Sequence, residues 1–276
     1  LPSDLEADDI LILLILLLAV LETAAVEYLY NNPTYYHLDD HTWESDDFRA
    51  MRLGEYAAGL ETLDPDQLAA WMAEMEYDLT GWNGEDLGFM EPGRQKPAAF
   101  RKLADAYRTV FQDLKYFPIP ESTDPETPPV SYENGWMDPR TYGGKRGHEG
   151  CDIMGNACPR GFYPVVSISD GTVENVGWLN QGGWRIGIRT PSGLYLYYAH
   201  LYEYSRQWQV GDQVSAGQLL GFMGDSGYSD VEGTVGNFDV HLHVGMYLKT
   251  DHYEEMSINP YWILRYLEKR RLRFCF

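Results

Sequence analysis

Histidine and aspartate side chains at the spacing of metal ligands gather in two short motifs. The first motif, Gly-His-Glu-Gly-Cys-Asp, carries His148 and Asp152. The second, Val-His-Leu-His-Val, carries His241 and His243 in an apolar run typical of a strand, so both imidazoles emerge on one face. A catalytic zinc ion takes three protein ligands from histidine and carboxylate side chains and keeps a fourth position for water. The two motifs therefore predict a zinc site.

The supply of imidazole exceeds what one zinc ion needs. A third source is His200, at the end of a strand-like apolar run that starts at residue 194. A lone histidine is usually a hydrogen-bonded or surface side chain, but four of the seven histidines of this chain fall in these three segments. A structural site would use all its ligands and is more commonly built on cysteine thiolates. The surplus therefore favours a catalytic ion.

The stretch from about residue 147 to residue 260 resembles the lysostaphin and LytM-type zinc endopeptidases, which cut peptide cross-links in bacterial cell walls. An ordered series of motifs carries this resemblance, and such a series is far more specific than three histidines alone. Besides the two motifs above, the series consists of GFYPVV at 161–166, DGTV at 170–173, YAHL at 198–201, VGDQVSAGQ at 210–218, GFMGDSG at 221–227 and Asn-Pro at 259–260.

The resemblance implies that His148, Asp152 and His243 bind one zinc ion, and that His200 and His241 face the reacting water and carbonyl. The chemistry agrees with these roles. Zinc lowers the pKa of bound water to about 7 and polarises a scissile carbonyl. Hydrolysis further needs a group that moves the water's proton to the leaving amine and a group that stabilises the oxyanion. Imidazoles titrate near neutral pH and suit both tasks, and the sequence leaves open which histidine performs which.

Two features depart from the usual pattern of that family. An insertion-like stretch at residues 227–239 separates the GDSG turn from the last motif, and we expect it to reshape one wall of the groove. Cys151 stands between two ligands, with Cys158 seven residues later. These two cysteines are either a disulfide, which an exported protein would permit, or two buried thiols. A nucleophilic Cys151 explains fewer of the neighbouring residues than a metal site does.

A second histidine pair lies in the first half of the chain. His37 and His41 flank Asp39 and Asp40, and the two imidazole positions are four apart in the sequence. On this spacing alone the pattern favours a polar surface turn over a second metal site.

Charge and composition predict an α+β protein of two domains. After residue 131 there are 13 basic and 16 acidic residues, against 8 and 26 before it. Apolar residues recur at helical spacing in the first half, while glycines and short alternating runs in the second half indicate antiparallel strands. We therefore expect an all-α helical domain at 1–116, a Pro-rich acidic linker at 117–131, and a β domain with a zinc-containing groove at 132–276. The acidic balance argues against nucleic acid as a partner.

The longest apolar run, residues 10–21, has twelve residues, whereas a membrane-spanning helix needs about 20. Acidic residues precede it where a signal peptide carries positive charge. These observations favour a buried helix of the first domain and no membrane span within this chain. Because the chain opens on leucine, an export signal or anchor upstream is compatible with an extracellular or cell-envelope protein.

The resemblance implies a zinc metalloendopeptidase whose substrates are peptidoglycan peptides. The alternative function is a wall-binding or regulatory module that partners another cell-wall hydrolase, although such relatives typically lack some of the five site residues. A third possibility is a secreted metallopeptidase that acts on proteins. We also consider contact between the helical domain or its linker and the groove. An oxygen from residues 117–134, such as that of Glu121, Asp124, Glu126 or Asn134, would occupy the water position and hold the enzyme latent, although a linker that only spaces the domains is the favoured interpretation.

Overall fold

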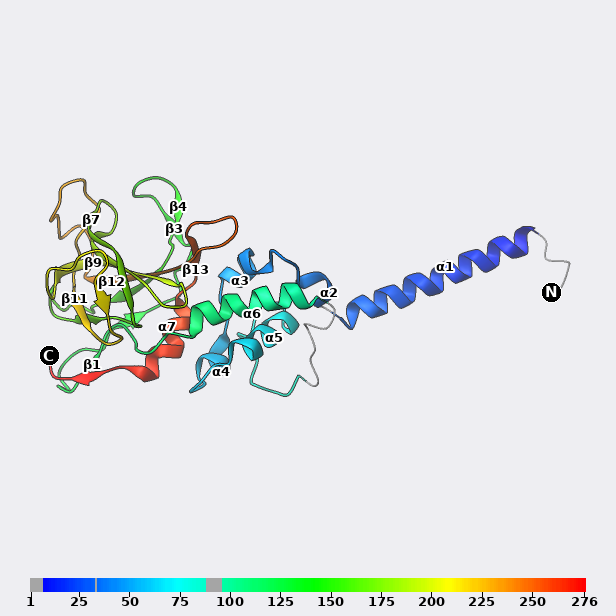
Figure 1. The fold of residues 1–276 in the computed structure, drawn as a ribbon, viewed down its shortest axis with the longest axis horizontal. Helices are drawn as coiled ribbons and strands as arrows, with labels where there is room; N and C mark the ends of the chain where they lie inside the picture. Colours follow the sequence, from blue (N-terminus) through cyan, green and yellow to red (C-terminus); the bar gives the residue numbers. More distant parts are fainter. Residues whose placement is uncertain (1–6, 33, 88–95) are drawn as a thin grey trace.

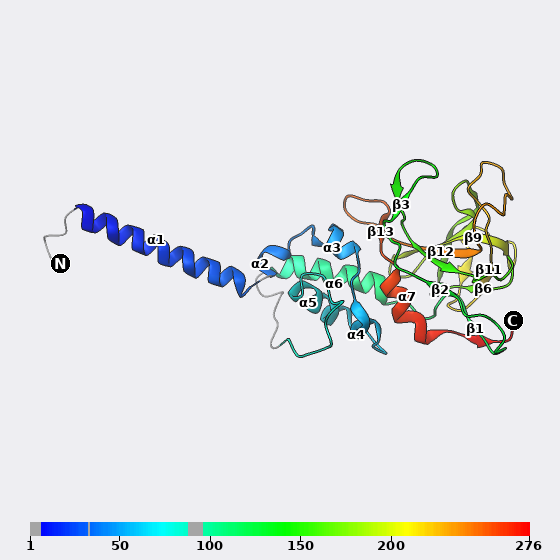
Figure 2. The ribbon, with the colours of Figure 1, turned by 180° about the vertical axis from the view of Figure 1, so that it is seen from behind.

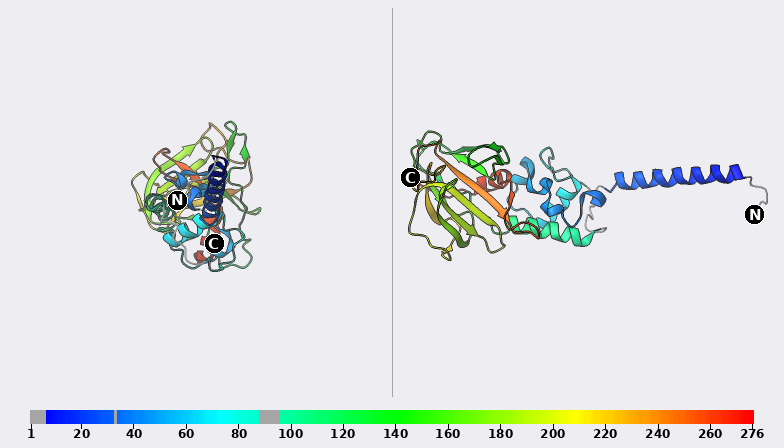
Figure 3. Two further views of the ribbon diagram at one scale, coloured as in Figure 1. Left: turned by 90° about the vertical axis from the view of Figure 1, so that its right-hand side faces the viewer. Right: turned by 90° about the horizontal axis from the view of Figure 1, so that it is seen from above.

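The computed structural model describes residues 7–32, 34–87 and 96–276 of the chain. Figure 1 shows three regions in a row: a single long helix that carries the N-terminus, a group of short helices, and a β region that holds the C-terminus. The view from behind in Figure 2 and the view from above in Figure 3 give the same order. The β region and the short helices pack against one another, whereas the long helix stands apart from both.

The first helix, α1 (Ala7–Tyr30), overturns the expectation of a buried helix at residues 10–21. None of its residues is buried, and its leucines and isoleucines are about half exposed. The apolar run is only the middle of a 24-residue helix, which is long and apolar enough to cross a membrane. A helix that is apolar on all faces needs either protein or lipid around it. Here the short helices do not surround α1, so the prediction that it is buried was wrong. The length of the apolar run alone, twelve residues, was not a sound basis for excluding a membrane-spanning helix.

The short helices form as their sequences predict. Asp64 accepts a hydrogen bond from the backbone N–H of Gln67, and Pro65 follows as the first residue of α5 (Pro65–Glu74). A proline also opens α6 (Pro97–Phe111), whose buried face includes Leu103 and Tyr107. These two helices pack together. The remaining helical elements of the region are α2 (Thr34–His37), η1 (Thr42–Glu44), α3 (Asp46–Arg49) and α4 (Gly54–Ala58).

The β region is built on one antiparallel sheet of ten strands. Its main path runs β10-β7-β8-β9-β12-β5-β2, with β11 joined to β9 and β6, and β13 joined to β12. The strands are β2 (Ser131–Tyr132), β5 (Cys151–Met154), β6 (Pro164–Val166), β7 (Gly171–Leu179), β8 (Gly183–Arg189), β9 (Tyr195–Tyr204), β10 (Gln213–Val214), β11 (Leu219–Met223), β12 (His241–Leu248) and β13 (Met256–Ile258). A separate hairpin consists of β3 (Pro139–Arg140) and β4 (Arg146–Gly147).

The segment at 117–131 is more firmly packed than a spacer of its composition suggests. Phe117 and Ile119 are buried in an apolar cluster that includes both helical and sheet residues. The short strand β1 (Glu121–Ser122) pairs in parallel with β14 (Arg273–Phe274), which follows α7 (Tyr261–Leu267) and η2 (Glu268–Arg270) near the C-terminus. Apolar side chains at alternate positions of the Phe-Pro-Ile-Pro run explain this packing. The domain boundaries at 116 and 131 stay a prediction.

Candidate metal centre

Three side chains converge on one point at the centre of the sheet. His148 follows β4, Asp152 lies on β5, and His243 lies opposite Asp152 on β12. The Nε2 atom of His148 lies 3.0 Å from Oδ1 of Asp152 and 3.0 Å from Nδ1 of His243. The same Nδ1 and Oδ1 atoms are 2.9 Å apart. The three ligand atoms therefore present two nitrogens and one oxygen to a shared point.

The donor chemistry of this cluster fits a metal cation. Nδ1 of His148 lies 3.0 Å from the carbonyl oxygen of Gly135, so it donates its proton there. The Nε2 lone pair is then left facing a carboxylate, two acceptors that repel each other unless a cation or a proton lies between them. Fixing the outer nitrogen of a ligating histidine in this way is the usual arrangement at metal sites.

Two further residues hold the ligands of this cluster in place. Arg140, on β3, donates to the other oxygen of Asp152 at 3.2 Å, which leaves Oδ1 for the cluster. Gly150 provides room for the ring of His243, because a Cβ atom at residue 150 would lie 2.3 Å from Cε1 of that ring. Neither residue was singled out from the sequence. For Gly150, the available signal was its position in the Gly-His-Glu-Gly-Cys-Asp motif.

The carboxyl group of Asp152 is ionised. Burial opposes ionisation, but the neighbouring imidazoles of His148 and His243 outweigh it and hold the pKa of Asp152 well below its usual range. A permanently negative ligand beside two neutral imidazoles matches the needs of a divalent cation. Burial also lowers the pKa of His243, and the Asp152 hydrogen bond only partly offsets this.

His200 and His241 lie beside this cluster. Their rings are 4.7 Å apart between centroids, and Nε2 of His241 is 3.8 Å from Oδ1 of Asp152. The ring of His200 is 6.0 Å from that of His243. The structure thus brings together all five residues that the sequence singled out, from β5, β9, β12 and the loop after β4.

Backbone carbonyls fix which nitrogen of each outer histidine is free. Nδ1 of His200 donates to the carbonyl of Ser226 at 2.8 Å, and Nδ1 of His241 donates to the carbonyl of Asp239 at 2.7 Å. The Nε2 atom of each ring is therefore left able to accept a proton. The GDSG turn of the sequence supplies Ser226, whose hydroxyl also donates to the Leu201 carbonyl. That turn thus positions a histidine distant in sequence.

His200 adopts a backbone conformation that is unusual for a residue with a side chain. Its φ is 61°, in the left-handed region, which costs of order 1–3 kcal/mol and is concentrated at functional sites. Its N–H donates to the Gly182 carbonyl at 2.7 Å. The bend turns the ring out of the strand pattern and toward His241.

The stretch at 227–239 forms part of one wall, as expected from the sequence. Tyr228 lines the groove, and its ring lies 5.7 Å from that of His200 in an edge contact. Phe238 lies 4.7 Å from the His200 ring and 5.2 Å from the His241 ring. Tyr142 stacks on Tyr228 at 4.5 Å. Aromatic rings therefore surround the two outer histidines.

The cluster opens into a groove of about 370 Å³. Two arginines of its wall have no ion pair among the described residues, and Nη1 of Arg185 and Nε of Arg146 are buried without a hydrogen-bond partner. The groove is lined by Arg146, His148, Glu149, Asp152, Asn175, Leu179, Gln181, Gly182, Arg185, Tyr195, Tyr197, Ala199, His200, Tyr228, His243, Tyr247 and Glu255. All of these residues belong to the β region.

The oxygens considered for a latent state lie elsewhere in the described structure. Glu121 pairs with Arg273, and Asp124 accepts a hydrogen bond from the backbone of Glu126. The side-chain oxygen of Asn134 accepts from Asn259 at 3.1 Å. β1–β14 pairing holds the acidic segment at the edge of the fold. Residues of the helical region and of 117–134 that the structure describes do not line the groove, so the less favoured alternative, a contact that keeps the enzyme latent, is not seen.

The cysteines are free thiols with separate surroundings. Cys151 is buried and donates to the carbonyl of Glu133, whereas Cys158 lies 3.3 Å from the hydroxyl of Tyr163. Burial, with the nearby charge of Asp152, strongly raises the pKa of the Cys151 thiol. A thiol that resists ionisation is a poor nucleophile, so Cys151 is a packing residue.

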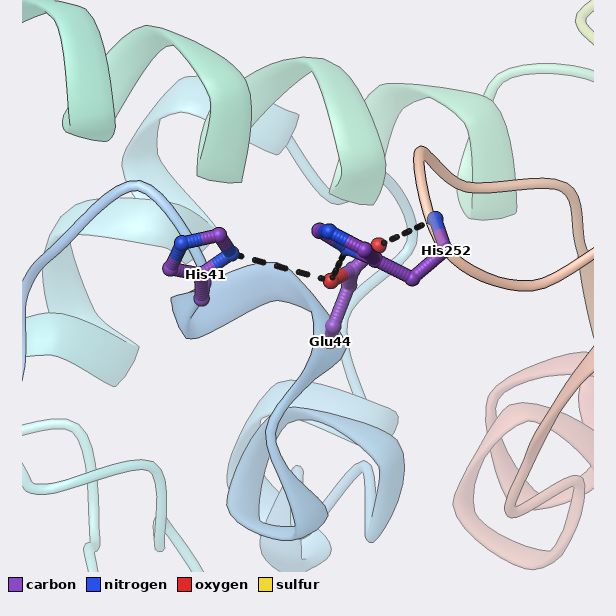
Figure 4. A group of neighbouring side chains, drawn as sticks. All are labelled: His41, Glu44 and His252. Carbon is purple, nitrogen blue, oxygen red and sulfur yellow. Dashed lines mark hydrogen bonds and ion pairs between the residues drawn. The ribbon is translucent and has the colours of Figure 1, made fainter.

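A second group of possible metal ligands lies between the helical and β regions. His41, Glu44 and His252 place one ligand atom each within 4.8 Å of one another (Figure 4). The sequence had paired His41 with His37. Instead, His37 lies 3.4 Å from Glu76. His252 was not expected here, because it is 211 positions from His41 in the sequence.

Comparison with known proteins agrees with the geometry. The sequence model described as peptidase family M23 matches residues 146–260. Among curated proteins, an L-Ala–D-Glu endopeptidase of Bacillus subtilis (strain 168) is 42% identical over 170 residues, which cover 62% of this chain and 49% of that protein. Lysostaphin of Staphylococcus simulans is 43% identical over 84 residues, 30% of this chain and 16% of that protein. The chain thus spans about half or less of these relatives.

A solved structure matches most of the chain. It comes from Ruminococcus gnavus ATCC 29149 and is described as a candidate LytM glycyl-glycine endopeptidase. The two are 40% identical with a TM-score of 0.72, and the match covers 88% of this chain and 98% of that one. Both the helical region and the β region are therefore shared with this relative.

Proposed function

Because the chain belongs to peptidase family M23, we propose that it is a zinc-dependent endopeptidase that hydrolyses peptide bonds in the stems or cross-links of bacterial peptidoglycan. One observation carries the proposal. Nε2 of His148, Oδ1 of Asp152 and Nδ1 of His243 converge, and His200 and His241 stand beside them at the edge of a groove. Membership of the family confirms the resemblance that the motifs indicated.

The residues of this chain divide into ligands and proton carriers. His148, Asp152 and His243 would hold the zinc, which when bound supplies an activated water and polarises the carbonyl. His200 and His241 each keep Nε2 free, so one would accept the proton of the water and pass it to the leaving amine, while the other, protonated from solvent, would donate a hydrogen bond to the oxyanion. Carbonyls of Ser226 and Asp239 hold both rings in the tautomer these tasks require.

The regulatory alternative has less support. A module that only binds wall polymer has no need for two histidines with fixed tautomers beside a ligand cluster. All five side chains are present; four of them line one groove, and the fifth, His241, has its ring 4.7 Å from that of His200. We assign the metallopeptidase domain to residues 132–276 and the helical region to residues 1–116. Residues 117–131 are the packed segment that connects them.

The place of action follows from the substrate. Peptidoglycan lies outside the bacterial cytoplasmic membrane, so we place the active site in the cell envelope or outside the cell. The exposed apolar helix α1 is compatible with an export signal or with an anchor. An anchored enzyme would reach wall peptides close to the membrane.

Purified peptidoglycan provides the test. The protein should clear wall suspensions with zinc, lose this activity with a chelator, and regain it when zinc is returned. Mass spectrometry of fragments from walls of several cross-link types then identifies the bond, including the L-Ala–D-Glu and Gly-Gly bonds that name the relatives. Denatured casein serves as the control for general proteolysis. Clearing that persists unchanged after complete zinc removal would falsify the proposal.

A further inference from the structure

Three side chains from two regions of the fold meet outside the groove. His41 and Glu44 lie at the two ends of η1, and His252 lies in the loop between β12 and β13. Figure 4 shows both rings turned toward the carboxylate of Glu44. Nδ1 of His252 is 2.7 Å from Oε2 of Glu44, and Nδ1 of His41 is 3.9 Å from the same oxygen. The Nδ1 atoms of both histidines thus face the same carboxylate oxygen of Glu44.

A single ion pair does not account for this arrangement. The His252–Glu44 contact is a hydrogen bond, but His41 lies beyond hydrogen-bond distance, and its ring stands 5.4 Å from that of His252. The carboxylate of Glu44 is only 8% exposed, whereas the two imidazoles are 71% and 59% exposed. A buried carboxylate with an imidazole on each side can supply three ligands to a tetrahedral ion. The fourth coordination position is then left to water, as in zinc sites with two histidines and one carboxylate.

The surroundings favour a cation. The three residues line a hollow of about 540 Å³ together with Asp39 and Asp47. Most of the chain's excess negative charge lies in this first half. The backbone N–H of His252 donates to Oε1 of Glu44 at 3.3 Å, which leaves Oε2 facing the two imidazoles. Acidic residues around a site raise the local concentration of cations.

We propose that His41, Glu44 and His252 bind a divalent transition metal, Zn²⁺ in the first place. Two imidazole ligands favour zinc over magnesium or calcium, which prefer oxygen. The ion would fasten the loop at 249–255 to η1. That loop also carries Glu255, which lines the groove, so the second metal would hold one part of the groove wall against the helical region. The proposal does not depend on the function of the first site.

The number of zinc ions bound per chain tests the proposal of a second metal site. The full chain, purified in mild detergent, is freed of metal, equilibrated with a measured concentration of free Zn²⁺, and analysed by mass spectrometry of the metal. We expect two zinc ions per chain. His252→Ala and Glu44→Gln should each retain one. His37→Ala is the matched control, because His37 lines the same hollow but pairs with Glu76, and it should retain two.

A second background separates this site from the proposed catalytic one. In a His148→Ala, His243→Ala double variant the first site is destroyed, and one zinc ion should remain. Adding His252→Ala should remove that ion while circular dichroism stays unchanged. The inference is overturned if the folded wild type binds one ion at saturating zinc and His252→Ala retains it, or if the zinc in the double variant survives loss of His252. Loss of wall hydrolysis alone bears on the other proposal.

Discussion

At the scale of single residues, the site combines side chains with different tasks and distinct environments. The neighbouring His148 and His243 hold the pKa of the buried Asp152 well below its usual range, and Arg140 donates a hydrogen bond to its other oxygen. His200 is buried, and burial lowers its pKa well below the usual value. This division predicts different consequences for changes at the ligands and at the outer histidines.

Replacing any of His148, Asp152 or His243 by alanine should remove both zinc and activity, because each contributes one of three ligand atoms. His200→Ala and His241→Ala should instead keep zinc and lose about 10²- to 10⁴-fold in kcat, the usual contribution of a proton-transfer group. Metal analysis beside wall hydrolysis separates the two classes. A folded His200→Ala or His241→Ala protein without zinc would show that our ligand assignment is wrong.

His200 should remain neutral at pH 6.5 in the metal-free protein. Burial lowers its pKa most, and the nearby His241 and His243 lower it further when charged. Because a lowered pKa means that the ring releases its proton at a lower pH, the neutral form dominates at the pH where a free histidine is about half protonated. Histidine NMR titration, with the resonance assigned through His200→Gln, measures this. A midpoint at or above 6.5 would contradict the structure.

Arg185 should favour substrates that carry a free carboxylate near the scissile bond. Its Nη1 atom is buried in the groove wall without a partner among the described residues, and a hydrogen bond to a charged group contributes about 1.5–3 kcal/mol. Arg185→Gln should therefore lower kcat/KM by about 10- to 100-fold on a wall peptide with a free carboxylate. For the same peptide with that carboxylate amidated, Arg185→Gln should change kcat/KM little. Arg206→Gln, which alters an exposed pair with Asp212, is the control.

At the scale of elements, strand register and glycine spacing set the geometry. On β12, His241 lies opposite Met154 and His243 opposite Asp152 on β5. A slip of one residue would turn every side chain of β12 to the other face. The buried Leu242 and Val244 hold the register, because the slip would expose them.

Gly150→Ala should disturb the metal site more than the fold. The added methyl group would lie 2.3 Å from Cε1 of His243 and 2.7 Å from the carbonyl oxygen of Val244, so the ring must move. We expect zinc affinity to fall by about 10- to 100-fold, as when support for a metal ligand is lost. Competition with a chelator of known affinity measures the change. Gly81→Ala, where a methyl group meets no atom within 4 Å, should leave zinc affinity as it was.

At the scale of the whole molecule, α1 is separable from the rest. Since none of its residues is buried, removing the chain through residue 30 deletes no core contact among the described residues. The truncated protein should keep its Tm within about 2 °C, because changes away from packed features usually cost under 0.5 kcal/mol. We also expect the full chain to bind lipid vesicles in a flotation assay, and the truncated protein to lose this binding. Marked destabilisation by the truncation would restore the earlier expectation that the helix packs inside the fold.

The sequence by itself indicated the peptidase family and singled out the five residues that the structure brings together, because residue types and an ordered motif series are local features. It also indicated helices before about residue 116 and strands after it, since hydrophobic periodicity is local as well. Tertiary structure alone decided what depends on distance. It placed Ser226 and Asp239 behind the outer histidines, brought His252 to Glu44, packed residues 117–120 into the core, and left α1 outside it. The sequence of an apolar helix is the same whether protein or lipid covers it. Only the positions of the neighbouring elements distinguish a helix buried in protein from one available to lipid.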